Sequence, residues 1–273
     1  MKILILGASG YAGQAIAQRL GEHYEVYGTY HSQKNEGIAQ NRMLQLDLGI
    51  PGSIKNILDR IRPQIIISSL GGDFQLQLAA HNDVANYLAE NKAGKIIFLS
   101  TANVFDAAEE NPHYESDRTD SHTDYGRFKI ACEHLLQEKL NDRCVTVRIP
   151  EIWGRNCPRI LKLIEDTESH TPIVTYPNLH VNYTTNIQIA EWIAYIIKED
   201  LGGIFHIGTR DTYDYMQFQS ELSMLLGLKK PVFKKELIPQ KCFQAVLPGR
   251  QEIPEKLQRK VIDVLHYLEH VQK

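Results

Sequence analysis

The sequence lacks the features of disulfide-stapled, membrane or nucleic-acid-binding proteins. Its 273 residues include only four cysteines, which lie far apart with no CxxC pair and no histidine at metal-ligand spacing. We therefore predict free thiols, no metal site and a cytoplasmic location. Lys and Arg number 30 against 33 Asp and Glu, so the chain has no basic field for nucleic acid and no polybasic membrane patch.

No apolar run approaches the length of a membrane span. The N-terminal run, residues 1–6, is interrupted by glycine at Gly7, well short of a signal peptide or a transmembrane helix. It is typical of a buried strand. We find no internal repeat and no low-complexity segment, so we expect a protein that is soluble throughout.

Apolar runs of β-branched character alternate with helical periodicity in the first 150 residues. The runs lie at 3–6, 25–29, 43–46, 65–68, 96–99 and 145–149, and the helical stretches at 11–20, 52–61, 74–91 and 124–140. The connections are long enough for right-handed crossovers between parallel strands. The sequence therefore predicts an α/β fold, a doubly wound, Rossmann-like parallel sheet of six strands.

Beyond about residue 150 the pattern loosens, because prolines interrupt short segments. Helical periodicity returns at 186–198, 214–226 and 255–270. We predict a dinucleotide-binding domain over 1–150 and a smaller C-terminal α/β part over 151–273 that binds the substrate. The segment 186–207, including a possible strand at 203–207, is expected to rejoin the main domain.

A GxxGxxG run follows the first strand directly and opens the first helix. Such glycines permit a tight turn and a close approach to a pyrophosphate, while the helix N-terminus supplies free N–H donors. A glycine-rich turn without a ligand is the alternative. We expect a dinucleotide, bound by Gly7, Ser9, Gly10, Tyr11, Ala12 and Gly13.

The end of the second strand bears on which dinucleotide is bound. The segment Tyr30, His31, Ser32 contains no acidic residue to bind a ribose diol and repel a 2′-phosphate. NADP(H) is therefore favoured over NAD(H), with His31, Ser32 and Lys34 as candidate phosphate contacts. After the third strand, Asp47 and Leu48 are placed either to hold the adenine ring or to cap a helix.

Three residues form a candidate catalytic set. Thr101 ends the fifth strand, with Ser100 as an alternative hydroxyl, and Tyr125 and Lys129 stand four residues apart on one helix, which places them on one face. An ammonium one turn away favours the phenolate of a tyrosine whose ordinary pKa is about 10. Tyr125 is then a proton donor to a carbonyl oxygen that accepts a hydride, and Thr101 hydrogen-bonds that oxygen.

These motifs, with the run from Leu99 to Asp106 and the run from Val147 to Gly154, resemble the extended short-chain dehydrogenases, and most closely the dTDP-4-dehydrorhamnose reductase family. The resemblance covers nearly the whole chain. It implies NAD(P)H-dependent reduction of a keto sugar nucleotide, with Thr101, Tyr125 and Lys129 as the triad and a homodimer as one option. By the same resemblance, Tyr30, Ser69, Leu70, Ile149, Tyr125 and Lys129 contact the cofactor.

The substrate side departs from that family. Ala102 stands where the family has an aspartate, and Leu247 stands in the region of its Arg-Pro pair, for which Arg250 is a substitute. The substrate contacts that we predict are Asn103, Arg155, Asn182 and Arg250. For Arg155 a surface-loop role is equally compatible with the sequence.

Two other functions stay open at this point. An NAD-dependent nucleotide-sugar epimerase would recycle its cofactor instead of consuming it. A non-catalytic regulatory protein would keep the fold for binding alone, although an intact set of Thr101, Tyr125 and Lys129 argues against it.

Overall fold

The computed structural model describes residues 1–34, 38–91 and 94–272. Its centre is a parallel sheet of seven strands in the order β11-β6-β5-β4-β1-β2-β3. The strands are β1 (Lys2–Leu6), β2 (Glu25–Tyr30), β3 (Met43–Gln45), β4 (Ile65–Ser68), β5 (Lys95–Thr101), β6 (Cys144–Ile149) and β11 (Gly203–His206). The predicted fold class is confirmed. The sheet has one strand more than the six predicted, because β11 pairs with β6 at its edge.

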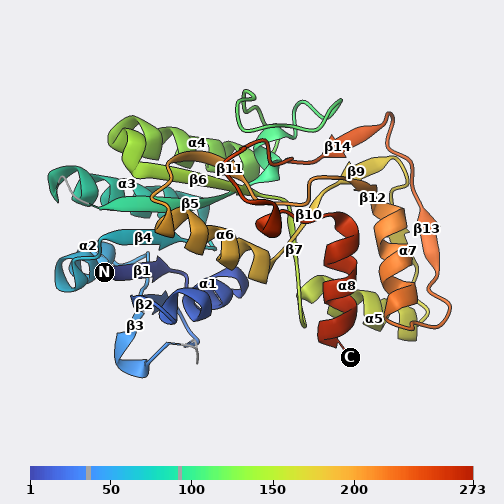
Figure 1. The fold of residues 1–273 in the computed structure, drawn as a ribbon, viewed down its shortest axis with the longest axis horizontal. Helices are drawn as coiled ribbons and strands as arrows, with labels where there is room; N and C mark the ends of the chain where they lie inside the picture. The colour runs from blue at the N-terminus through green and yellow to red at the C-terminus, as the bar shows by residue number, and fades with distance from the viewer. Residues whose placement is uncertain (35–37, 92–93, 273) are drawn as a thin grey trace.

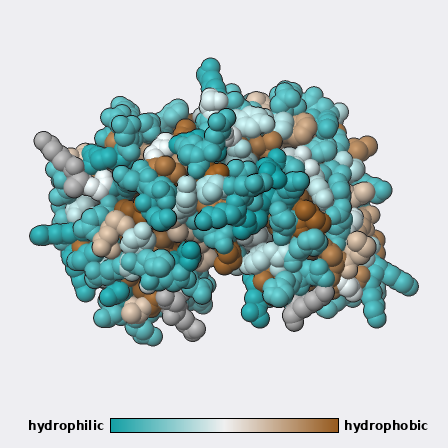
Figure 2. Space-filling view, viewed as in Figure 1, coloured by the Kyte–Doolittle hydropathy of each residue, from teal (hydrophilic) through white to brown (hydrophobic). Residues whose placement is uncertain are grey.

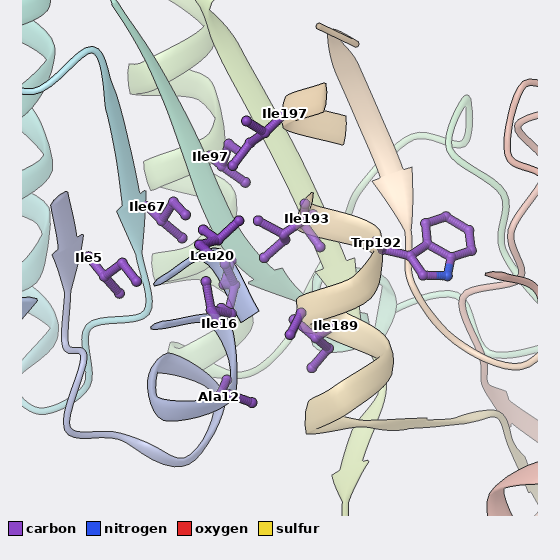
Figure 3. Close-up of a cluster of buried hydrophobic side chains, with 14 of the residues drawn as sticks. Ile5, Ala12, Ile16, Leu20, Ile67, Ile97, Ile189, Trp192, Ile193 and Ile197 are labelled. Carbon is purple, nitrogen blue, oxygen red and sulfur yellow. The ribbon is translucent and has the colours of Figure 1, made fainter. Parts of the chain in front are cut away.

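Helices cover both faces of the sheet. One face packs on α1 (Tyr11–Gly21) and α6 (Asn186–Lys198), and the other on α2 (Ser53–Ile61), α3 (Phe74–Asn91) and α4 (Asp124–Leu140). Figure 3 shows Ile16 and Leu20 of α1 beside Ile193 of α6. Successive strand residues point to opposite faces, so Ile3 and Ile5 enter the first core and Leu4 and Leu6 the second.

The rest of the C-terminal half forms a smaller lobe beside this sheet (Figure 1). Its small sheets pair β10 with β7, β12 and β14 with β9, and β13 with β8. Its strands are β7 (Glu151–Trp153), β8 (Ile173–Thr175), β9 (Leu179–Val181), β10 (Tyr183–Thr185), β12 (Tyr213–Asp214), β13 (Phe233–Lys235) and β14 (Cys242–Gln244), and its helices are α5 (Pro158–Glu168), α7 (Tyr215–Leu225) and α8 (Val261–Gln272). Figure 2 shows an indentation between the two lobes along the lower edge of the face drawn.

The predicted helix 255–270 is divided. A 3-10 turn, η4 (Glu255–Leu257), precedes α8 and ends at Gln258, whose backbone is extended. The carbonyl of Leu257 accepts a hydrogen bond from the Trp192 indole at 2.8 Å, and the carbonyl of Arg259 accepts one from the backbone N–H of Arg210 at 2.9 Å. These tertiary hydrogen bonds use carbonyls that a continuous helix would need for itself.

Candidate active site

The glycine turn joins β1 to α1 at positions where a residue with a side chain would be strained or would clash with the backbone. Gly7 has a φ of 81°, and a Cβ there would lie 2.6 Å from the Ser69 carbonyl oxygen. A Cβ on Gly13 would lie 2.3 Å from the Gly7 oxygen, so α1 packs against the turn only with glycine at that position. Gly10 is the N-cap of α1 and makes no side-chain capping bond. The turn therefore presents the N-terminal N–H groups of α1 without a competing side chain.

A cavity of about 400 Å³ opens beside this turn. Most of the residues predicted to bind the cofactor line it, namely Gly7, Ser9, Gly10, Tyr30, His31, Asp47, Leu48, Ser69 and Leu70. Ser32 is exposed and is not part of this lining, and the Lys34 ammonium lies 5.5 Å from the centre of the Tyr30 ring. The cavity and the glycine cradle fit a dinucleotide, and no carboxylate stands at the end of β2.

A larger cavity, of about 590 Å³, contains the predicted catalytic residues. Thr101, Tyr125 and Lys129 line it together with Tyr11, Ala12, Ser69, Leu70 and Ile149. Ser69 and Leu70 line both cavities. A dinucleotide that spans the two would therefore extend from the end of β2 to the triad.

The start of α4 is packed closely against the end of β5. Thr123 caps the helix by accepting a hydrogen bond from the Gly126 N–H at 3.1 Å. A Cβ on Gly126 would lie 2.0 Å from the Ser121 hydroxyl oxygen and 2.4 Å from the Asn103 carbonyl oxygen. Glycine after Tyr125 therefore lets the helix approach the segment that carries Thr101 and Asn103.

Lys129 is almost fully buried beneath Tyr125. Its ammonium donates to the Leu99 carbonyl at 2.9 Å and lies 4.7 Å from the Phe98 ring centre and 5.9 Å from that of Tyr125. Burial lowers the pKa of Lys129 to about 8, and the thiol of Cys132 and the carboxylate of Glu133 oppose that shift. The cation is thus retained near neutral pH, close to the phenol.

Tyr125 lines the larger cavity and keeps 40% of its residue surface exposed. Partial burial raises the pKa of the phenol, and a side-chain hydrogen bond with Thr101 opposes the rise. In the resting site the single proton of the Thr101 hydroxyl is donated to the Asn103 amide oxygen at 2.9 Å. Tyr125 is therefore protonated near neutral pH, which is the state of a proton donor.

A buried ion pair lies one helical turn beyond Lys129. The Glu133 carboxylate accepts hydrogen bonds from the Ser100 hydroxyl and from the Arg148 guanidinium, the latter at 2.8 Å. Glu133 and Arg148 keep 7% and 4% of their side-chain surface exposed. The pair joins α4, β5 and β6 next to the triad, and the Ser100 hydroxyl, although Ser100 lines the larger cavity, donates to Glu133.

The predicted substrate contacts divide. Asn103 lines the larger cavity, whereas Arg155 is exposed outside that lining. Asn182 is fully buried. Its side-chain NH₂ donates to the carbonyls of Thr209 and Val246, and its side-chain oxygen accepts from the Val246 N–H. Arg250 donates to the carbonyls of Gly202 and Ile204 and to the Glu252 carboxylate.

Asn182 and Arg250 therefore hold segments of the fold together instead of facing the cavity. Charged side chains that sequence reasoning missed do line it, among them Glu109, Glu151 and Arg159. A proline at the first position of α5 signals a helix start next to Arg159, yet nothing local shows that this turn faces the triad.

The four cysteines are free and buried. Within the ranges that the structure describes, no group of three or more His, Cys, Asp or Glu side chains is placed to hold a metal ion. No helix in those ranges is long and apolar enough to cross a membrane.

Comparison with known proteins places the chain in a family. The model of the NAD dependent epimerase/dehydratase family matches residues 3–184, which include the glycine turn and the triad. The chain belongs to this family. The resemblance to the extended short-chain dehydrogenases is thereby confirmed, and a nicotinamide dinucleotide is the cofactor that the family's description carries.

Individual proteins resemble this chain in sequence or in fold. A dTDP-4-keto-6-deoxy-D-glucose reductase of Streptomyces niveus is 23% identical over 215 residues, covering 74% of this chain and 71% of the relative. A dTDP-4-dehydrorhamnose reductase of Bacillus anthracis, solved with NADP, is 17% identical with a TM-score of 0.80, covering 98% of this chain and 96% of that one. A UDP-glucose 4-epimerase of Thermus thermophilus, solved with NAD, is 16% identical with a TM-score of 0.80, covering 99% and 98%.

Proposed function

We propose that this chain is an NAD(P)H-dependent reductase of a keto sugar nucleotide, acting on a 4-keto-6-deoxy sugar. The observation that carries the proposal is the placement of Thr101, Tyr125 and Lys129 in one cavity that shares two lining residues with the cavity at the glycine turn. The similarity to the Streptomyces niveus reductase supports the reductive direction.

The residues divide the chemistry between them. When bound, the nicotinamide supplies the hydride that reduces the carbonyl carbon. Tyr125 donates its phenolic proton to the carbonyl oxygen, and the Thr101 hydroxyl hydrogen-bonds the same oxygen and orients the substrate. Lys129 stabilises the resulting phenolate through its charge and also holds the ribose of the nicotinamide. Solvent then restores the proton to Tyr125.

NADPH is the proposed reductant. His31 lines the smaller cavity where the adenosine ribose would lie, and no acidic residue stands between Thr29 and Lys34 to repel a 2′-phosphate. We further propose that residues 1–150 form the cofactor-binding domain and 151–273 the substrate part, with 186–207 joining the main domain through α6 and β11.

A spectrophotometric assay tests this proposal. We expect the purified chain to oxidise NADPH in the presence of at least one 4-keto-6-deoxy sugar nucleotide, with a higher kcat/KM for NADPH than for NADH. Interconversion of sugar epimers without loss of NADPH would instead indicate an epimerase. Failure of every keto sugar nucleotide to support oxidation of either cofactor would contradict the proposal.

A further inference from the structure

The larger cavity contains a cation that the catalytic scheme does not use. Of the residues that the structure describes, five charged ones line this cavity, the bases Lys129 and Arg159 and the acids Asp106, Glu109 and Glu151. Lys129 is buried beneath Tyr125. Arg159 keeps 45% of its side-chain surface exposed, so its guanidinium is open to a ligand in the cavity.

Two of the acids are engaged by the wall itself. Asp106 accepts hydrogen bonds from the His122 N–H at 2.7 Å and the Thr123 hydroxyl at 2.6 Å. Glu109 accepts one from the Gln244 amide at 3.0 Å. These bonds direct both carboxylates to neighbouring protein groups and leave Arg159 as the group in this lining best suited to an anion.

Arg159 is held loosely. Its Nε lies 3.5 Å from Oε2 of Glu151, and its Nη1 lies 3.4 Å from the Ile152 carbonyl oxygen. Both distances are at the long limit for a hydrogen bond. Since a guanidinium has five N–H donors in a planar fork, several donors remain for a ligand, and the fork matches the geometry of phosphate oxygens.

The position of Arg159 suits the part of a substrate that lies away from the reacting carbonyl. Ile149 pairs with Thr101 in the main sheet, and Glu151 begins β7 two residues further along. Arg159, in the first turn of α5, sits against Glu151. In a 4-keto pyranose the anomeric oxygen that bears the diphosphate lies across the ring from the carbonyl.

We propose that Arg159 binds the diphosphate of the sugar nucleotide. This inference rests on the proposed function for the orientation of the sugar. It assigns the recognition of a nucleoside diphosphate to the first turn of α5, in place of Arg155 and Arg250, the arginines that the sequence indicated.

The test is the binding of UDP and dTDP to the full-length protein, measured by calorimetry. We expect Arg159→Gln to weaken binding of both by roughly 10- to 100-fold, the effect of losing charge-assisted hydrogen bonds, while the Kd for NADPH stays unchanged. Lys162→Gln is the matched control, because Lys162 lies on the same helix, is 70% exposed and pairs with Asp166. It should bind both diphosphates as the wild type does.

Arg159→Lys provides a second measurement that keeps the charge and removes the fork. We expect it to weaken UDP and dTDP binding less than Arg159→Gln does. The inference is overturned if the wild type binds neither diphosphate, if both Arg159 variants bind them as tightly as the wild type, or if the losses for NADPH and UDP are equal.

The two proposals fail separately. Diphosphate binding that depends on Arg159, without oxidation of NADPH by any keto sugar nucleotide, would refute only the reductase function. Oxidation of NADPH with a KM that Arg159→Gln leaves unchanged would refute only the role of Arg159.

Discussion

The two cavities, which share Ser69 and Leu70, differ in the segments that line them. At the smaller one, the lining residues stand where a strand of the main sheet ends, as Gly7 follows β1, Tyr30 ends β2 and Ser69 follows β4. The larger cavity also has a wall formed by the smaller lobe, which we call the far wall. It joins segments that are distant in sequence, such as Arg159 of α5, Val181 of β9 and Gln244 of β14.

The difference shows which parts of a site local sequence determines. The carboxyl ends of parallel strands meet at one edge of the sheet. Residues that follow each strand are therefore brought together by the sheet itself, independently of how the smaller lobe packs. The far wall depends on how the smaller lobe packs. Cofactor and triad residues should therefore tolerate changes in that lobe.

The largest effect is expected at Tyr125. Removing its hydroxyl in Tyr125→Phe removes the proton donor and should lower kcat for NADPH oxidation by about 10²- to 10⁴-fold, while the Kd for NADPH stays within twofold. Tyr114→Phe serves as the control, since Tyr114 is 45% exposed and lies outside the lining of both cavities. A Tyr125→Phe enzyme within tenfold of wild-type kcat would remove Tyr125 from the mechanism.

The buried pair behind the triad should affect stability and pH dependence together. Glu133→Gln leaves Arg148 as a buried charge with a weaker partner, which we expect to cost about 3 kcal/mol in the free energy of unfolding. Burial lowers the pKa of Lys129 to about 8, and loss of the Glu133 charge lowers it further. Activity, which needs the Lys129 cation, should fall above about pH 8 in the wild type and at lower pH in the variant.

Urea unfolding and pH profiles of kcat measure these two effects. Glu138→Gln, an exposed position on the same helix, is the control and should change neither. An alkaline limb that stays in place in Glu133→Gln would show that the Glu133 charge does not act on Lys129.

A smaller effect concerns two buried histidines of the main domain, His81 on α3 and His206 on β11. Burial lowers the pKa of His81 and of His206 to about 3, with Lys129 adding to the shift for the first and Arg148 for the second. Their pKa in the unfolded chain is about 6.5. The unfolded state therefore binds more protons between those values, and stability falls as pH falls through this window.

The slope should be about 1.4 kcal/mol per pH unit for each histidine. We expect thermal melts of His81→Gln and His206→Gln between pH 6.5 and pH 4 to show a shallower loss of Tm than the wild type. His134→Gln, at an exposed position, should keep the wild-type slope. Equal slopes in all four proteins would mean that neither histidine is buried in its neutral form.

Sequence reasoning was most accurate where a site is contained in one strand, turn or helix. Tyr125 and Lys129 share a helix face, and the glycine turn needs only β1 and α1, so their convergence could be predicted. The pattern at 203–207 was noticed, but its pairing with β6 depends on α6 returning the chain to the sheet edge.

Polar side chains of the smaller lobe were the least predictable. Asn182 and Arg250 are polar residues in irregular segments, and only the packed structure shows that their donors bind carbonyls such as those of Val246 and Gly202. Arg159 was missed for the converse reason, since a helical arginine is usually solvated. Its environment is created by β7, which precedes α5 and pairs with β10.

The central claim is a net hydride transfer to a sugar carbonyl. It is tested most directly by incubating the wild-type protein with NADPH deuterated at C4 of the nicotinamide and a 4-keto-6-deoxy sugar nucleotide, with analysis of the product by mass spectrometry and NMR. We predict deuterium on the newly formed carbinol carbon and one NADP⁺ for each product molecule. A converted sugar that carries no deuterium, with NADPH unconsumed, would contradict the account.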